Sequence, residues 1–170
     1  MEQDRLGSQN RSPVKQTKLE FVFAKPADEA VIKSLLAECS LPHEDIRGHL
    51  RHFIVFGSKG NIVGVVGLEV LGSVGLLRSL AVKESHRRKG LGKTLCEKME
   101  GYAASQGIKT LYLLTRNAEG FFKKMGYREV ERTAAPGPIQ KTKEFSTLCP
   151  ETAACLVKEI DFCFDLSAER

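Results

Sequence analysis

The segment at residues 76–93 restricts the fold of this chain more than any other part of the sequence. An apolar run at 76–82 is followed by the basic stretch His86-Arg87-Arg88-Lys89 and then by glycines at 90 and 92. The near-continuous apolar run predicts a strand that is buried on both faces of a sheet. The spacing of apolar residues from Leu91 onward predicts a helix. A buried strand therefore runs through a short basic loop directly into a helix.

This loop has the properties of an anion-binding site. Gly90 and Gly92 permit positive φ angles and a close approach of backbone N–H groups. The first turn of the following helix leaves unpaired N–H groups at its positive dipole end, and Arg87, Arg88 and Lys89 add charge. We expect a pyrophosphate to bind here; a solvated loop is the alternative.

Two familiar phosphate-binding motifs do not fit this loop. Gly92-Lys93-Thr94 imitates the end of a P-loop, but that motif requires glycine where Arg87 stands. A dinucleotide fingerprint that begins at Gly90 would need its third glycine at Leu95. Each motif lacks a required glycine.

The apolar patterns elsewhere predict a single α+β domain over residues 18–164, with tails at 1–17 and 165–170. We expect strands at residues 19–24, 53–56, 62–71, 74–82, 110–115, 127–133 and 153–160. We expect helices at 29–38, 91–106 and 118–125, a short helix that begins at 41–45, and another within 139–148. Because a helix connects residue 82 to residue 110, the strands on either side of it should be parallel.

Composition excludes several classes of protein. No stretch approaches the roughly 20 apolar residues that span a bilayer, and the polar N-terminus carries no export signal, so we expect no membrane association and a cytoplasmic location. The five cysteines lack a C-x-x-C pair, which disfavours disulfides and zinc and favours buried thiols. The net charge of +5 is concentrated in one short loop, which suits a small phosphate ligand better than nucleic acid.

The loop and the segment after the next strand together resemble a known family. The loop reads Arg87-x-x-Gly90-x-Gly92 after a strand that ends Leu80-Ala81-Val82. This resembles the pyrophosphate loop of the GNAT superfamily of N-acetyltransferases. Downstream, Ala118 and Gly126 match the family's Asn-x-x-Ala-x-x-x-Tyr-x-x-x-Gly-Phe element, while Thr115, Phe122 and Tyr127 replace its usual residues.

The resemblance, over about residues 21–160, implies a mixed sheet of about seven strands flanked by helices. It also implies acetyl-CoA as cosubstrate, a primary amine as acceptor and no metal. The implied cofactor-binding residues are Leu80, Ala81, Val82, Arg87, Arg88, Lys89, Gly90, Leu91, Gly92, Lys93, Thr115 and Phe122. The pantetheine arm would lie between the splayed strands at 80–82 and 111–115, and the Ala81 N–H would polarise the thioester carbonyl. Phe122 has no hydroxyl, so the family's usual acid is missing.

Two charged residues within the apolar strands are candidates for acceptor chemistry. Glu69 is the only ionisable residue at 62–71, and a carboxylate among apolar neighbours holds its proton more tightly, so it is a candidate base; a solvated residue is the alternative. Arg78 should share a face with Leu76 and Leu80. It would bind an acceptor carboxylate or oxyanion bidentately, or pair with Glu69 across the hairpin. Cys149 would lie on the pocket rim.

The phrases at 76–82, 111–115 and 144–150 resemble N-acetyltransferases associated with bacterial arsenic resistance. This implies a small amino acid or an amino-acid-like toxin as acceptor, such as the organoarsenical arsinothricin; an arginine in the pocket favours an anionic amino acid over a polyamine. A housekeeping amino-acid N-acetyltransferase and, because of Phe122, a non-catalytic acyl-CoA-binding regulator stay open. Analogy with the superfamily suggests a homodimer.

Overall fold

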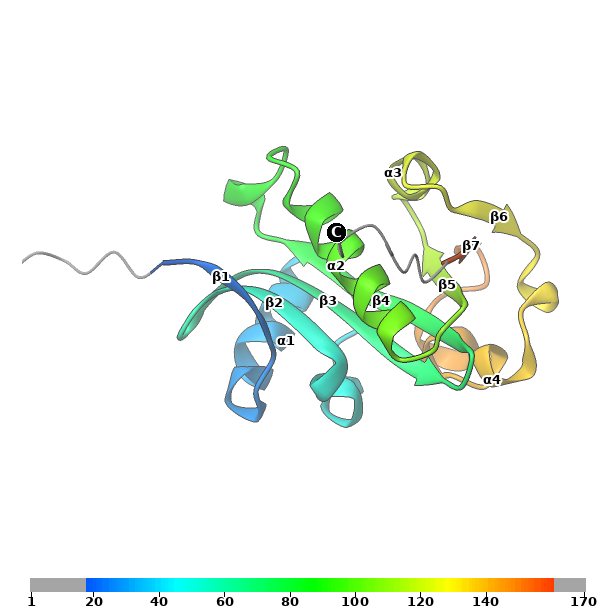
Figure 1. The fold of residues 1–170 in the computed structure, drawn as a ribbon, viewed down its shortest axis with the longest axis horizontal. Helices are drawn as coiled ribbons and strands as arrows, with labels where there is room; N and C mark the ends of the chain where they lie inside the picture. The colour runs from blue at the N-terminus through cyan, green and yellow to red at the C-terminus, as the bar shows by residue number, and fades with distance from the viewer. Residues whose placement is uncertain (1–17, 161–170) are drawn as a thin grey trace, which may run out of the picture.

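The computed structural model describes residues 18–160, which form a seven-stranded mixed sheet with helices on both faces (Figure 1). The strand order is β1-β2-β3-β4-β5-β7-β6. The predicted α+β class is therefore confirmed. The tails that we expected at 1–17 and 165–170, and Cys163, lie outside the described residues.

The element boundaries follow the sequence patterns closely. The strands are β1 (Glu20–Phe23), β2 (Phe53–Ser58), β3 (Asn61–Leu71), β4 (Val74–Val82), β5 (Thr110–Thr115), β6 (Arg128–Val130) and β7 (Ala154–Glu159). The helices are α1 (Glu29–Glu38), α2 (Leu91–Ser105), α3 (Glu119–Lys124) and α4 (Gly137–Gln140). Shorter helical turns are η1 (Pro26–Asp28), η2 (Ile46–His52), η3 (Glu84–His86), η4 (Arg132–Ala134) and the π-helical turn η5 (Glu144–Leu148).

Three elements differ from the expectation. The short helix that we expected to begin at residues 41–45 begins at Ile46. The strand expected at 127–133 is β6 alone, because the chain turns into η4 after it. The helix expected within 139–148 is divided into α4 and η5, which are separated by residues 141–143.

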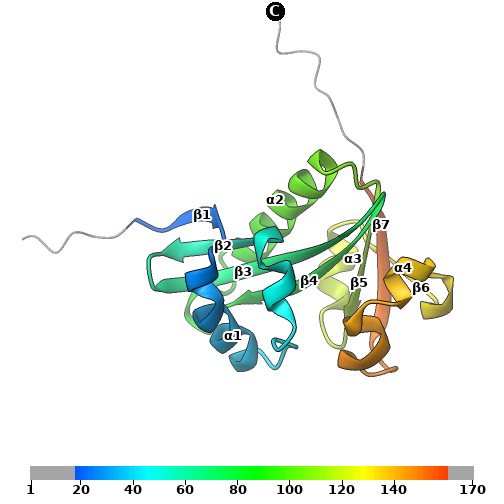
Figure 2. The same ribbon diagram turned by 90° about the horizontal axis from the view of Figure 1, so that it is seen from below.

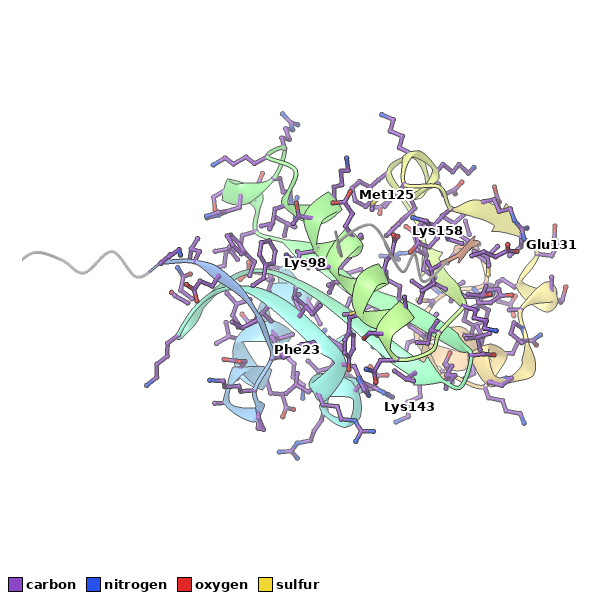
Figure 3. The ribbon with its side chains drawn as sticks, viewed as in Figure 1. Phe23, Lys98, Met125, Glu131, Lys143 and Lys158 are labelled. Atoms are coloured by element: carbon purple, nitrogen blue, oxygen red, sulfur yellow. The ribbon has the colours of Figure 1, made fainter. Side chains whose placement is uncertain are left out.

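The central strands β3 and β4 are buried on both faces, as their sequences predicted. α2 covers one face and packs its Leu95 and Met99 in a cluster with Val66 and Leu77 of the sheet. α1 lies on the opposite side of the sheet (Figure 2). Side chains fill the space between α2 and the strands (Figure 3). Burial of these apolar side chains, at roughly 25 cal/mol per Å², stabilises the three layers.

A β-bulge interrupts β4 at Ser79 and Leu80. Val65 of β3 pairs with Ala81 and Gly67 pairs with Arg78, so two residues on β4 oppose one on β3. Ser79 has a φ of 57°, in the left-handed region that non-glycine residues rarely adopt. A bulge of one residue reverses the side-chain alternation beyond it.

The bulge corrects one prediction. Leu80 does not share a face with Arg78 and Leu76, because it packs with the α2 cluster, whereas Leu76 packs with Ile139 and Phe145 of α4 and η5. Strict alternation along the strand would have been right without the extra residue.

The parallel pairing of β4 with β5 is short. Only Val74, Gly75 and Leu76 pair with β5, through Thr110 to Tyr112, although β4 continues to Val82 and β5 to Thr115. β5 pairs along its whole length with β7 on its other side. The two parallel strands therefore separate beyond Leu76, which confirms the splayed arrangement.

Within residues 18–160, no helix has the length and apolar character to cross a bilayer.

Candidate functional site

A cleft of about 840 Å³ lies where β4 and β5 separate. β4 contributes Leu77 through Val82, and β5 contributes Leu113, Leu114 and Thr115. Segments from elsewhere in the chain complete the wall, and these are residues 39–44 after α1, Arg87, residues 116–118, Phe122, Glu144, residues 148–150 and Ala153. Because backbone edges of β4 and β5 face this cleft unpaired with each other, it can hold an extended polar ligand.

The basic loop beyond β4 enters the left-handed backbone region at two positions. Arg88 and Gly90 both have positive φ angles, of 62° and 79°. Gly90 is the N-cap of α2, and its carbonyl accepts the first intrahelical hydrogen bond, from the Thr94 N–H at 3.0 Å. The N–H groups of the first turn before Thr94 are left for an external acceptor. This geometry is that of an anion-binding helix N-terminus.

Arg87 connects this loop to the cleft. Its Nε donates to the Val82 carbonyl at 2.9 Å, and one Nη lies 3.4 Å from the Cys39 sulfur. The side chain is exposed and lines the cleft. Arg87 thereby places a positive charge at the end of β4.

The structure brings together about half of the predicted cofactor-binding residues. Those that line the cleft are Leu80, Ala81, Val82, Arg87, Thr115 and Phe122. The others follow Arg87 directly, at the N-terminus of α2, and they do not line the cleft: Arg88, Lys89, Gly90, Leu91, Gly92 and Lys93.

Thr115 and Phe122 have local structural roles as well. The Thr115 hydroxyl accepts a hydrogen bond from the Ala118 N–H at 3.0 Å and so fixes the entry to α3. Phe122 is 5% exposed and packs edge-on against Phe121 and Tyr127. Phe122 carries no proton donor, and the hydroxyl of its ring neighbour Tyr127 donates to Glu100.

Arg78 lies at the centre of a buried ionic cluster, the Arg78 cluster, which consists of Arg78, Asp45, Glu69 and Glu144. Its Nη1 donates to Asp45 and to Glu69, at 2.7 Å each, and its Nη2 donates to Asp45 at 2.6 Å. Its Nε donates to the Ser79 hydroxyl at 3.2 Å and lies 3.7 Å from Glu144 Oε2. The ion pair with Glu69, which the sequence left open, is present.

This cluster changes the interpretation of Arg78. The bidentate fork that we predicted for an acceptor anion is filled by Asp45. Three carboxylates surround one guanidinium, so the cluster carries a negative surplus. The expectation that Arg78 favours an anionic acceptor therefore loses its physical basis.

Glu69 is 4% exposed, so the solvated alternative is wrong. Its carboxylate accepts from Arg78 and lies 3.7 Å from His49. Glu69 lines a second hollow, which it shares with residues 44–45, 47–49 and 141–143, and not the β4–β5 cleft. Its role as base stays a prediction that this position does not favour.

Asp45, His49 and Glu69 are the one group of candidate metal ligands among residues 18–160, with donor atoms within 4.8 Å of one another. The Arg78 guanidinium already lies on both carboxylates. A cation here would compete with that fixed positive charge.

Glu144 is a cleft residue that sequence reasoning missed. It is 6% exposed, and the pKa of its carboxyl is raised to about 7, first by burial and then by the charges of Glu69 and Asp45, against the lowering effect of Arg78. Nothing in the polar pattern of residues 143–150 distinguished Glu144 from its neighbours. Only the contact with Arg78, distant in sequence, marks it.

Cys149 lines the cleft, and burial raises the pKa of its thiol to about 11. Burial likewise raises the pKa of Cys96 to about 12 and that of Cys155 to about 11. Within residues 18–160 the cysteines are free thiols, and these three are protonated near neutral pH.

Comparison with known proteins supports the same class. The model of the Acetyltransferase (GNAT) family matches residues 19–127. An uncharacterized N-acetyltransferase of Chlorobaculum tepidum is 39% identical over 113 residues, which cover 66% of this chain and 70% of that protein. An amino-acid acetyltransferase of Pseudomonas fluorescens is 32% identical over 96 residues, which cover 54% of this chain but 22% of that protein.

Solved structures share the fold. The N-acetylglutamate synthase of Neisseria gonorrhoeae, crystallised with coenzyme A and L-arginine, superposes with a TM-score of 0.72 at 22% identity. The match covers 86% of this chain and 34% of the synthase, so this chain spans about a third of that protein.

Proposed function

Because this chain belongs to the acetyltransferase (GNAT) family and is an acetyl-CoA-dependent N-acetyltransferase, we propose that it acetylates the primary amine of a small amino acid or an amino-acid-like toxin. The observation that carries this proposal is the cleft between β4 and β5, with the basic loop at its end. Arg87, which leads into the N-terminus of α2, lines this cleft, and so do Glu144 and Cys149.

The residues fit acetyl-CoA in the way that the family resemblance implies. The diphosphate would bind the N-terminus of α2, residues 87–93, where N–H groups and positive charge coincide. The pantetheine arm would extend along Leu80, Ala81 and Val82, past the bulge that interrupts the ladder. The N–H predicted at Ala81 would hold the developing oxyanion, an interaction worth about 3–4 kcal/mol. Thr115 and Phe122 would bound the arm on the β5 side.

An organoarsenical such as arsinothricin is the toxin that we propose as acceptor. All three phrases that resemble arsenic-resistance acetyltransferases, at 76–82, 111–115 and 144–150, contribute residues to the cleft wall. The resemblance therefore falls on residues that can touch an acceptor, and this supports the proposal.

A housekeeping amino-acid N-acetyltransferase is the second candidate, favoured by the similarity to an amino-acid acetyltransferase over 54% of this chain. A non-catalytic acyl-CoA-binding regulator rests only on Phe122. The limits of the domain at 18–164, the cytoplasmic location, the homodimer and the absence of nucleic-acid binding stay predictions.

Acetyl-CoA mixed with a panel of amines tests these candidates by release of free thiol. We expect release with arsinothricin or with amino acids. Release with standard amino acids alone would favour the housekeeping enzyme, and CoA binding without release would favour the regulator.

The role of Arg87 can be tested separately. Arg87→Ala should weaken CoA binding about tenfold in calorimetry, because a charged hydrogen bond contributes about 1.5–3 kcal/mol. Arg128→Ala, an exposed arginine on β6, should bind CoA as the wild type does. Equal affinities of the wild type and both variants would contradict the predicted diphosphate site.

A further inference from the structure

Glu144 lines the cleft with an acid that the protein leaves incompletely paired. Its Oε2 is buried and has no hydrogen-bond partner within residues 18–160. Arg78 Nε lies 3.7 Å from this oxygen. A buried carboxylate oxygen without a partner costs free energy, so its position calls for an explanation outside the fold itself.

Arg78 cannot pair fully with Glu144. Of its five N–H groups, four are used by Ser79, Asp45 and Glu69. The bulge places the Ser79 hydroxyl on the Nε that would otherwise face Glu144. Glu144 is consequently the third carboxylate on a guanidinium that the other two already neutralise.

The groups around Glu144 come from every neighbouring element. Arg78 faces it from β4 and Glu69 from β3, and Asp45 precedes η2. Arg132 of η4 donates to the carbonyls of Phe145 and Pro150, at 2.7 and 2.8 Å, and Cys149, which follows η5, is a neutral thiol. Burial, followed by the charges of Glu69 and Asp45, raises the pKa of Glu144 to about 7 against the lowering effect of Arg78.

An ammonium group suits this end of the cleft. It would place a positive charge against the negative surplus of the Arg78 cluster and donate hydrogen bonds to an acid that lacks them. A carboxylate or arsonate group of the acceptor would instead be repelled by this negative surplus. The acceptor should therefore enter with its amine toward Glu144.

We propose that Glu144, positioned by the Arg78 cluster, binds the ammonium group of the acceptor and removes its proton before acetyl transfer. This rests on the proposed function and names the base of that reaction. One ammonium proton goes to the Glu144 carboxylate, and the freed nitrogen lone pair attacks the thioester carbon. The C–S bond then breaks, the sulfur leaves with the electron pair, and a second nitrogen proton goes to it. The products are the amide and CoA thiol, and Glu144 returns its proton to water.

His43 is the rival base. It lines the same cleft, and its Nδ1 lies 3.0 Å from the Leu41 carbonyl. The test must therefore separate the two residues.

The pH dependence of kcat/KM, with acetyl-CoA and the best amine of the panel, tests the proposal. The wild type should lose activity about tenfold per pH unit below pH 7, because only the ionised carboxylate accepts a proton. Glu144→Gln should lower kcat/KM at pH 8 by about 100-fold or more. It should also lack the decline in kcat/KM below pH 7, which we call the acidic limb, and it should bind CoA like the wild type. Glu151→Gln removes the same charge from an exposed residue and should leave rate and profile unchanged.

Several outcomes would overturn the proposal. The first is a wild-type kcat/KM that does not change between pH 6 and 8. The second is an active Glu144→Gln enzyme whose kcat/KM still falls below pH 7. The third is an acidic limb that is lost in His43→Gln but not in Glu144→Gln. If Glu144→Gln does not fold, Glu144→Asp can replace it, because its side chain is one methylene shorter and holds the carboxylate away from the acceptor. An unchanged limb and rate in that variant would also overturn the proposal. A wild type that binds CoA but turns over no amine refutes the proposed function and this inference together, whereas an active wild type with an equally active Glu144→Gln refutes the inference alone.

Discussion

Two clusters of charge in this fold, one part-buried and one buried, differ in how completely they are paired. In the first, which we call the Glu100 cluster, Glu100 of α2 accepts a hydrogen bond from the Tyr127 hydroxyl at 3.0 Å and an ion pair from Lys158 of β7 at 2.8 Å (Figure 3 labels Lys158). Its one acid therefore has a partner on each oxygen. In the Arg78 cluster, three acids share one base, and Glu144 Oε2 has no hydrogen-bond partner.

The difference follows the location of the cleft. None of the Glu100 cluster lines it, and these contacts join α2 to β7. Arg78 and Glu144 both line it. A fully paired buried network is what a fold needs, whereas an unbalanced one at a cleft is typical of a functional site. The pairing of buried charge, more than its presence, therefore separates structure from function here.

The largest effect should come from Arg78→Met, which leaves Asp45, Glu69 and Glu144 buried without a counter-ion. Removing one partner of a buried ion pair costs about 3–5 kcal/mol, so we expect a loss of this size in the free energy of unfolding at pH 7, measured by urea denaturation. Lys158→Met should cost less, because Lys158 is 25% exposed and water can solvate Glu100. A loss below about 1 kcal/mol for Arg78→Met would mean that the two clusters do not differ.

Glu144→Gln should stabilise the protein, and only at high pH. The pKa of Glu144 is about 7 in the folded chain, against an ordinary 4.5, so the folded state binds a proton that the unfolded state releases. The stability that the protonated Glu144 carboxyl contributes is fully present below pH 4.5 and is lost as the pH rises through 7. At about 1.4 kcal/mol per pKa unit, Gln should recover about 3 kcal/mol at pH 8 and less than 1 kcal/mol at pH 5.

Urea denaturation of both proteins at the two pH values measures this difference. Glu151→Gln serves as the exposed control and should change stability little at either pH. Equal stabilities of Glu144→Gln and wild type at pH 8 would show that Glu144 is well paired, like Glu100. If Glu144→Gln is more stable than the wild type at pH 8 but inactive, then Glu144 serves function at the expense of stability.

Much of the fold could be predicted from local patterns. The apolar runs identified β3 and β4 as central strands, and the bounds of α1 and β5 were predicted to the residue. The bulge at Ser79 could not be predicted, because serine does not favour a positive φ and the register depends on the partner strand. The reversed orientation of Leu80 follows from that one residue.

The residues of the cleft could be predicted where they are neighbours in sequence, and not where only tertiary packing brings them together. Arg87 and Gly90 lie in one contiguous loop, so their spacing alone predicted an anion site. The Arg78 cluster combines residues from four separate segments, at positions 45, 69, 78 and 144. Sequence reasoning found Arg78 and Glu69 because a charge inside an apolar strand is conspicuous. Asp45 and Glu144 stand in polar segments, where a charge is ordinary, and only tertiary packing brings them to Arg78.

The smallest expected effect on the free energy of unfolding concerns the Glu100 cluster. Tyr127→Phe removes one hydrogen bond from the Glu100 cluster and leaves the ring in the apolar core with Phe122. A hydrogen bond to a charged group contributes about 1.5–3 kcal/mol when buried, but Lys158 still pairs with Glu100, so we expect a loss of about 1 kcal/mol in urea denaturation. Burial, followed by the charge of Glu100, raises the pKa of Tyr127, so the hydroxyl stays protonated and this loss should be equal at pH 5 and pH 8. Turnover should not change, because the Glu100 cluster does not touch the cleft. A pH-dependent loss, or a change in kcat, would mean that the fully paired cluster also takes part in function.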